Sequence, residues 1–355
     1  MANYKIQGST LTGIADEVRV IADTTNPMTI SAMNNNMATF KNSMDATLST
    51  QNSLIERLGA AVENAFAYAD DGIIDRTAVT YTNDRVSTIG DYVFQSNENL
   101  TSVDFPVVTD IGGYAFRSCT SLTSISFPVA TSIGVNAFYD CSALTNVNFP
   151  KLTSICDYAF YSCTALTNVN FPKVTSIGSM AFYSCTALTN ASFPKVTSIG
   201  SSAFAFCTNL TNISFPEVTS IAAAAFLGCS SLTSVSFSKV TTVPNMMLQS
   251  CIGLINVSFP LATNIGGNAF AFCSSLTSIS FPVATSIGGQ AFRQCASLTN
   301  LTLGASTVCT LANSNAFTST PIASGTGYIY VPASLVASYK AATNWSYYSS
   351  RISSI

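Results

Sequence analysis

A period of 22 residues constrains this chain more than any other feature of its sequence. Nine of the eleven cysteines follow one another at this step, from Cys119 to Cys295. Phenylalanine keeps the same step from Phe94 to Phe292, and Leu248 takes its one missing place. One unit reads A-F-x-x-C-x-x-L-T-x-I-x-F-P-x-V-T-x-I-G. Since a unit this short cannot bury its own apolar side chains, the period predicts a solenoid in which stacked coils share one core.

The leucine-containing half of the unit predicts a short strand. Leu122, Ile125 and Phe127 follow an L-x-x-L-x-L spacing, which turns the last two toward one face of the strand. Ser124 and Ser126 then point outward, and the following proline ends the strand. The glycine after the second isoleucine permits a tight corner.

The remaining part of the unit predicts a short helical turn. Ala115, Phe116, Cys119 and Leu122 recur at steps of 3 and 4 residues, which places them on one side of such a turn, facing the core. We therefore expect a β-solenoid of the leucine-rich repeat type, with ten coils of one short strand and one helical turn each.

Composition removes several classes of function. The 355 residues contain no histidine, and only 9% are charged, so Ser-His-Asp triads, Cys-His pairs and His-ligated metals are excluded. Acidic residues between 111 and 300 are only Asp140, Asp157 and Glu217, which form no paired carboxylate site by sequence. Fourteen basic residues and a net charge of -3 argue against nucleic-acid binding. We expect no enzyme activity and no cofactor.

The cysteines are expected to be buried free thiols. The nearest pair, Cys156 and Cys163, does not have zinc-site spacing, so no metal is expected. The N-terminus lacks the apolar run and cleavage site of a signal peptide, and no apolar stretch is long enough to insert into a membrane.

The repeat resembles the BspA-like leucine-rich repeat family over residues 86 to 304. That resemblance implies a solenoid at residues 73–304, including an N-terminal cap, and a role in surface binding without identifying the ligand. Residues 305–355 resemble the C-terminal cap that follows such arrays, through Asn315-Ala316-Phe317, the run from Tyr328 to Ala333, Tyr339-Lys340 and Asn344-Trp345.

The N-terminal part has a different pattern. Apolar residues alternate steps of 4 and 3 between residues 33 and 65, which predicts an α-helical coiled coil within residues 28–72. Extra apolar positions widen its seam and favour a homotrimer, whereas the alternative is a helical hairpin within one chain. The expected oligomerisation residues are Met33, Met37, Phe40, Met44, Leu54 and Leu58.

Residues 1–27 are predicted to form an attachment helix. Their segment from Gly8 to Asp16, with the run from Thr24 to Thr29, resembles the openings of phage and prophage tail-associated proteins. The resemblance implies tail or baseplate proteins as partners.

Three columns of outward-facing residues are candidate ligand-binding sites, each with a structural alternative. An asparagine column would either hydrogen-bond along the stack or bind glycans. A lysine column would be either a solvated edge or an anion site, and a tyrosine column would either cover apolar surface or contact sugar or protein. The residues are Asn146, Asn148, Asn168, Asn170 and Asn190; Lys151, Lys173, Lys195 and Lys239; and Tyr139, Tyr161 and Tyr183.

These observations favour a recognition protein. We expect a receptor-binding protein like a phage tail fibre, located in the virion tail, whose solenoid binds a bacterial surface polysaccharide or protein receptor. The alternative is a BspA-like adhesin at the bacterial cell surface.

Overall fold

The computed structural model describes residues 79–355, apart from the side chain of Asn170. The described residues belong to one compact unit, Arg76–Ile355. The attachment helix, the coiled coil and its seam residues fall in residues 1–78, outside the described residues. The homotrimer and the tail or baseplate partners therefore stay predictions.

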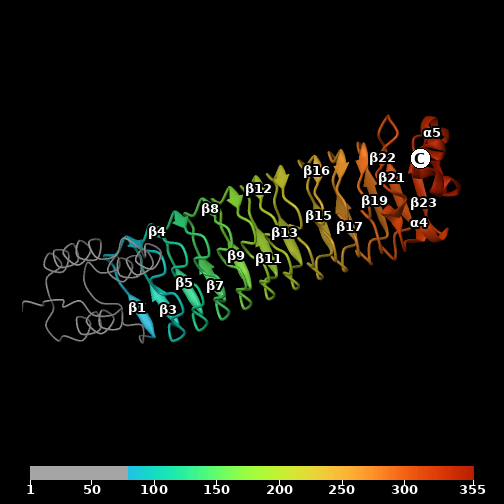
Figure 1. Ribbon diagram of the computed structural model, residues 1–355. Coiled ribbons are helices and arrows are strands. Elements are labelled where there is room, and N and C mark those ends of the chain that lie inside the picture. Colours follow the sequence, from blue (N-terminus) through green and yellow to red (C-terminus); the bar gives the residue numbers. More distant parts are fainter. Residues whose placement is uncertain (1–78) are drawn as a thin grey trace, which may run out of the picture. The chain divides into compact units, whose positions relative to one another are not determined.

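Residues 79–311 form a stack of coils (Figure 1). Each coil contributes two short strands, and each strand runs parallel to the corresponding strands of neighbouring coils. The first strand of each coil lies in one row, and the second, shorter strand lies in another. The first row contains β1 (Thr80–Thr82), β3 (Ser102–Asp104), β5 (Ser124–Ser126), β7 (Asn146–Asn148), β9 (Asn168–Asn170), β11 (Asn190–Ser192), β13 (Asn212–Ser214), β15 (Ser234–Ser236), β17 (Asn256–Ser258), β19 (Ser278–Phe281) and β21 (Asn300–Leu303).

The second row contains β2 (Thr88–Ile89), β4 (Asp110–Ile111), β6 (Ser132–Ile133), β8 (Ser154–Ile155), β10 (Ser176–Ile177), β12 (Ser198–Ile199), β14 (Ser220–Ile221), β16 (Thr242–Val243), β18 (Asn264–Ile265), β20 (Ser286–Ile287) and β22 (Thr310–Leu311). Where strands of neighbouring coils pair, residues at the same position of the repeat lie opposite each other, as Ser198 and Ser176 do. With the cap strand that extends the first row, the solenoid has about twelve coils. The expected ten is too few because the outermost coils depart from the 22-residue step of the markers; Phe317, for example, stacks on Phe292 at 5.4 Å but follows it by 25 residues.

The core consists of phenylalanine columns that run along the stack. Phe138 and Phe160 stack with ring centroids 5.3 Å apart and planes 4° from parallel. Phe127 and Phe149 belong to a second column and stack at 5.5 Å. These rings, together with the repeat cysteines and leucines, are fully buried. The inward positions predicted from the repeat are therefore confirmed.

The expected helical turn is wrong. Tyr114 and Ser118 have positive φ values of 58° and 57°, which interrupt any helix. The backbone N–H groups of Tyr114, Phe116 and Ser118 donate instead to carbonyl oxygens of the next coil. The segment is thus a pair of turns that extends the hydrogen bonding along the stack, although its 3- and 4-residue spacing does bring Ala115, Phe116 and Cys119 into the core.

The corner after each second-row strand requires close contact between coils. A Cβ atom added at Gly200 would lie 2.5 Å from the backbone of Gly178. Cys156 and Pro244 occupy this corner position in two coils, and there the second row is interrupted, between β6 and β8 and between β14 and β16. Proline also lacks the N–H that other corners donate to the preceding coil.

The C-terminal segment closes the last coil. It contains η1 (Ser314–Phe317), α4 (Pro321–Ser324), β23 (Tyr328–Val331), η2 (Ala333–Leu335), α5 (Val336–Ala341), η3 (Trp345–Arg351) and β24 (Ile352–Ser354). The backbone N–H of Cys309 donates to the Tyr339 hydroxyl at 2.8 Å, and the Trp345 indole N–H donates to the Cys309 carbonyl at 2.6 Å. Both aromatic side chains are fully buried, so they cover the end of the core.

Candidate functional site

The outward-facing side of the first-row strands, which we call the strand face, carries the predicted asparagines. On each strand the middle residue points inward and its neighbours point out, as in Asn190, Ala191 and Ser192. Asn146, Asn148, Asn168 and Asn190 are exposed on this face. Asn170 belongs to β9, and its side chain lies outside the described residues.

The asparagine column is largely engaged in hydrogen bonds within the solenoid. The Asn190 amide donates to Asn168 Oδ1 at 3.2 Å, and the Asn212 amide donates to Asn190 Oδ1 at 3.0 Å. Each of these donors also reaches the hydroxyl of the threonine before it in the chain, as Asn190 does with Thr189 at 3.0 Å. This arrangement matches the structural alternative, in which the amides stabilise the stack.

The lysines lie at the corner that follows the first-row strands. Lys151, Lys173 and Lys195, which we call the lysine edge, occupy the same position in three successive coils and are exposed. None of them forms an ion pair with a carboxylate among residues 79–355. Successive coils are about 4.8 Å apart, as parallel strands are, so the three cations form a short, evenly spaced row.

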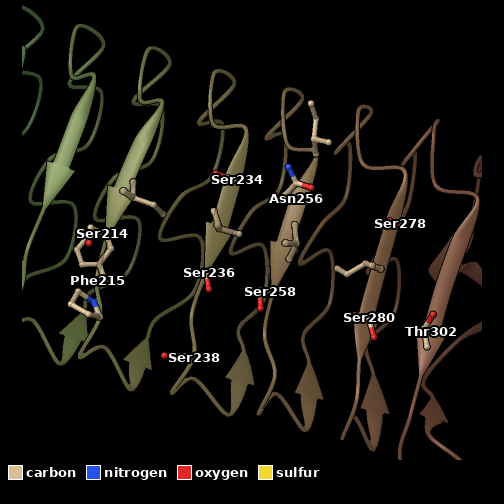
Figure 2. A pocket seen from close by; sticks show the side chains of 16 residues that line it. Ser214, Phe215, Ser234, Ser236, Ser238, Asn256, Ser258, Ser278, Ser280 and Thr302 are labelled. Atoms are coloured by element: carbon tan, nitrogen blue, oxygen red, sulfur yellow. The ribbon is translucent and has the colours of Figure 1, made fainter.

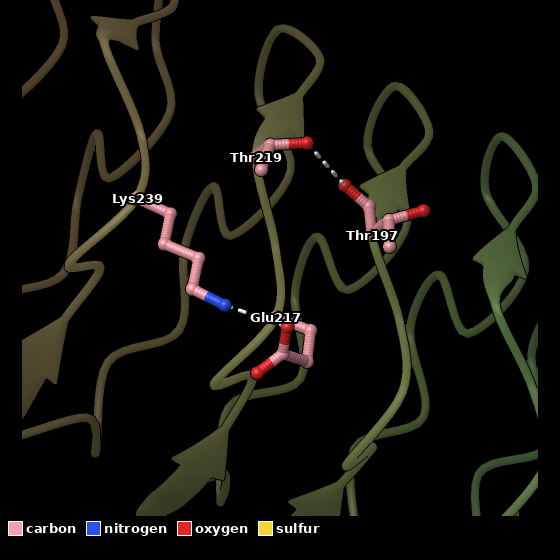
Figure 3. Close-up of polar contacts among 4 residues, drawn as sticks. All are labelled: Thr197, Glu217, Thr219 and Lys239. Carbon is pink, nitrogen blue, oxygen red and sulfur yellow. Dashed lines mark hydrogen bonds and ion pairs between the residues drawn. The ribbon is translucent and has the colours of Figure 1, made fainter.

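Lys239 differs from the other three lysines. Its Nζ forms an ion pair with Glu217 Oε2 at 2.6 Å, in the next coil toward the N-terminus (Figure 3). Both side chains remain about half exposed, at 45% and 53%. Because its charge is compensated, Lys239 does not extend the lysine edge.

The tyrosine column packs on a different side of the coil, next to the turns. Tyr139 and Tyr161 stack at 4.6 Å, and Tyr161 and Tyr183 stack at 4.8 Å, both with planes 1° from parallel. The Arg117 guanidinium lies 5.3 Å from the centre of the Tyr139 ring. The rings are half-buried and their inner faces are occupied by each other. They therefore offer mainly edges to a ligand, which favours a packing role.

A groove of about 740 Å³ lies on the strand face over β13, β15, β17, β19 and β21 (Figure 2). Serine hydroxyls from four adjacent strands line it, together with Asn256 and Thr302. We call it the serine groove; its serines on those strands are Ser214, Ser234, Ser236, Ser258, Ser278 and Ser280. Among the described residues, no charged side chain contributes to its lining.

Sequence analysis missed the serine groove. The columns of identical residues lie in the first half of the array, whereas the groove lies where the repeat is irregular. Ile255 replaces the threonine that precedes the strand in most coils, and Ser238 replaces the proline after Phe237. These two departures were the available signal.

The cysteines are confirmed as free thiols, all buried except the half-buried Cys156. Burial raises the pKa of the Cys207 thiol to about 12. Within residues 79–355, no group of three histidine, cysteine, aspartate or glutamate side chains could hold a metal ion. In the same part of the chain, no helix is long and apolar enough to cross a membrane.

These features define a leucine-rich repeat solenoid with an exposed polar strand face. A family model described as the BspA type leucine rich repeat region (6 copies) matches residues 87–204, 131–255 and 197–323. The chain belongs to this family. The match begins after residue 86, so it gives no support to the resemblance of the N-terminus to phage tail proteins or to a tail-fibre function.

One solved structure shows the same fold, and a second is a weaker match. A leucine-rich repeat protein from Bacteroides ovatus is 23% identical, with a TM-score of 0.52, over 78% of this chain and 92% of that one. A leucine rich cell surface protein from Faecalibacterium prausnitzii is 22% identical, with a TM-score of 0.42, over 72% of this chain and 87% of that one. No curated protein matches the chain.

Proposed function

We propose that the protein is an adhesin-type recognition protein of a bacterial cell surface, which binds an anionic glycopolymer along the lysine edge. Membership of the BspA type family supports a role in binding at surfaces. The proposal involves no catalytic step. Of the two functions predicted from the sequence, the proposal adopts the adhesin and not the tail fibre.

The lysine edge carries the proposal. Three exposed cations without a carboxylate partner among residues 79–355 repel one another, because they lie about 4.8 Å apart in adjacent coils. The same position is occupied by Val129 and Val283 elsewhere, so the repeat does not need a charge there. An anionic polymer would relieve the repulsion by placing a negative charge near each lysine.

The row fits a polymer better than a compact anion. A single small anion can approach two neighbouring lysines, whereas a chain with charges at regular intervals can contact all three. Each contact is weak because the side chains are exposed, and several weak contacts on one chain add up to useful affinity. Binding of this kind weakens with salt, since exposed charges are screened over about 8–10 Å.

The test is a Lys151→Ser, Lys173→Ser and Lys195→Ser triple variant. We expect wild-type protein to bind polygalacturonate, an anionic polysaccharide, with an affinity that falls as salt is raised from 50 to 500 mM. The triple variant should bind about tenfold more weakly or worse at low salt and should lose most of the salt dependence. Its melting temperature should be unchanged or slightly higher.

Lys239→Ser is the matched control, because it removes the same charge from the same repeat position but from a lysine already paired with Glu217. It should keep wild-type affinity for polygalacturonate. Equal binding by the triple variant and wild type would refute the proposal, and so would equal losses in the triple and control variants.

A further inference from the structure

The serine groove is lined by hydroxyl groups that are free for hydrogen bonding to a ligand. Within residues 79–355, the six groove serines donate no side-chain hydrogen bond, and Thr302 donates none either. The hydroxyls of Ser236, Ser258 and Ser280 form a row across adjacent strands (Figure 2). The groove therefore collects donors and acceptors that the solenoid itself does not use.

The backbone pairing between first-row strands is also interrupted at the groove. Strand β15 pairs with β17 but not with β13, and β17 does not pair with β19. In seven other coils a threonine hydroxyl just before the first-row strand donates to a carbonyl of the preceding coil, as Thr211 does to Thr189 at 3.1 Å. Thr233 and Thr277 make no such bond, and Ile255 has no hydroxyl. The hydrogen bond from this side chain to the preceding coil is thus missing in three successive coils that contribute to the groove.

Ile255 changes the partner of its neighbour. Asn190 and Asn212 donate to the hydroxyl of the threonine before them, at 3.0 Å and 3.1 Å. Asn256 follows isoleucine, so its side-chain amide has no such acceptor and makes no hydrogen bond within residues 79–355. An amide with a free donor and acceptor lies beside an apolar side chain that is 47% exposed.

We propose that the serine groove binds a neutral polysaccharide chain. Sugar hydroxyls both donate and accept hydrogen bonds, as the serine hydroxyls and the Asn256 amide do. The exposed Ile255 can cover the apolar C–H face of a sugar ring next to that amide. Because the groove crosses five strands and has no charged lining, an extended uncharged polyol fits it better than an anionic chain.

A peptide strand is a poorer occupant. Peptides commonly bind sheets by adding a strand to an exposed edge, through a row of unpaired backbone groups. The interruptions at β13/β15 and β17/β19 lie inside the stack, flanked by further coils on both sides. The groove also has no arginine or lysine for a carboxylate and no aspartate or glutamate for an ammonium group.

The inference is independent of the lysine edge, because it concerns later coils and an uncharged ligand. The test measures binding of three neutral polysaccharides, dextran, a β-1,3-glucan and a mannan, by affinity electrophoresis of the full chain. We expect wild-type protein to be retarded by at least one of them, equally at 50 and 500 mM salt. The Lys151, Lys173 and Lys195 triple variant should be retarded to the same extent.

Two variants address the groove itself. The first, Ser236→Ala with Ser258→Ala, removes two adjacent hydroxyls and should weaken binding about tenfold, because each lost hydrogen bond leaves a sugar hydroxyl unpaired. The second, Ile255→Thr, restores the residue found in other coils, gives the Asn256 amide an internal acceptor, and should also weaken binding. Ile255→Thr should fold normally, since threonine is the common residue there.

The matched control is Ser126→Ala with Ser192→Ala, which makes the same change at the same strand position outside the groove. This control should bind as wild type does. Three results would overturn the inference: no retardation of wild type by any of the three polysaccharides, equal retardation of the groove and control variants, or binding of denatured casein at the groove in place of the polysaccharides.

Discussion

The thiol of Cys207 donates a hydrogen bond to the backbone carbonyl oxygen of Phe182, with 3.1 Å between Sγ and oxygen. The same carbonyl oxygen accepts the backbone N–H of Cys185 at 3.2 Å. The Cys207 thiol therefore donates to the second lone pair of the Phe182 oxygen. Every repeat cysteine makes this bond to the residue 25 positions earlier. The cysteine column thus links successive coils, in addition to filling the core.

Replacing one repeat cysteine should separate these two roles. Cys207→Ala removes both the bond and the sulfur volume, and should lower the free energy of unfolding by about 1–3 kcal/mol. Cys207→Ser can keep the bond but buries a more polar group among apolar neighbours, and should still be destabilising. Denaturant unfolding monitored by circular dichroism measures both. Wild-type stability of Cys207→Ala would show that the linkage contributes nothing.

Stability should fall at alkaline pH. Burial raises the pKa of the Cys207 and Cys295 thiols from 9.0 to about 12, and the pKa values of the other repeat cysteines from Cys141 to Cys273 are also raised by burial. Between pH 9 and pH 12 the unfolded chain therefore loses thiol protons that the folded chain keeps. The contribution of the neutral thiols is fully present below pH 9 and is lost as pH rises toward 12.

Melting temperatures measured from pH 7 to pH 11 check this expectation. Cys207→Ala should show a shallower decline above pH 9, because one group that drives it is gone. In native protein at pH 8, the half-buried Cys156 should react with a thiol reagent well before the buried cysteines. Rapid reaction of all cysteines would contradict the burial on which both expectations depend.

The phenylalanine columns should contribute most to stability. Phe182 stacks between Phe160 at 5.3 Å and Phe204 at 5.1 Å and is fully buried. Phe182→Ala should lower the free energy of unfolding by about 3–5 kcal/mol, as large-to-small core changes do. Tyr183→Ala is the control, because it removes a half-buried ring from the next position in the chain. Equal losses in thermal unfolding would refute the assignment of the core.

The sequence predicted the fold well because burial repeats strictly. Positions such as Phe182 and Cys185 face the core in every coil, so one unit determines all of them. The backbone of the turn was mispredicted because a 3- and 4-residue spacing is compatible with a helix and also with turns at positive φ. Residues such as Tyr114 and Ser118 give no warning of that conformation, which usually favours glycine or asparagine.

The candidate site was predicted only in part. Regular columns revealed the exposed lysine edge, but the amides of Asn168 and Asn190 proved to bond to one another along the stack. The serine groove lies where the repeat changes, at Ser238 and Ile255, and where β13 does not pair with β15 and β17 does not pair with β19. The loss of these interstrand hydrogen bonds depends on how neighbouring coils pack, which cannot be predicted from the pattern of one repeat unit.

One of the left-handed turns contains a glycine, Gly228. Gly228 has φ +72°, and a Cβ atom added there would lie 2.8 Å from Cδ1 of Phe206. Gly228→Ala should therefore destabilise by about 1–2 kcal/mol, because alanine is strained at this φ and meets the ring. Ser250→Ala is the matched control at the same repeat position, where φ is already 62° with a side chain present, and should change stability by about 0.5 kcal/mol or less.

A double-mutant cycle with Phe206→Ala separates strain from contact. If the aromatic ring is the obstacle, Gly228→Ala should cost less in the Phe206→Ala background, with a coupling energy of at least about 0.5 kcal/mol. Phe206 is 38% exposed, so its removal leaves the core columns intact. Additive losses in thermal unfolding would mean that backbone strain alone explains the glycine, and a neutral Gly228→Ala would contradict the left-handed turn itself.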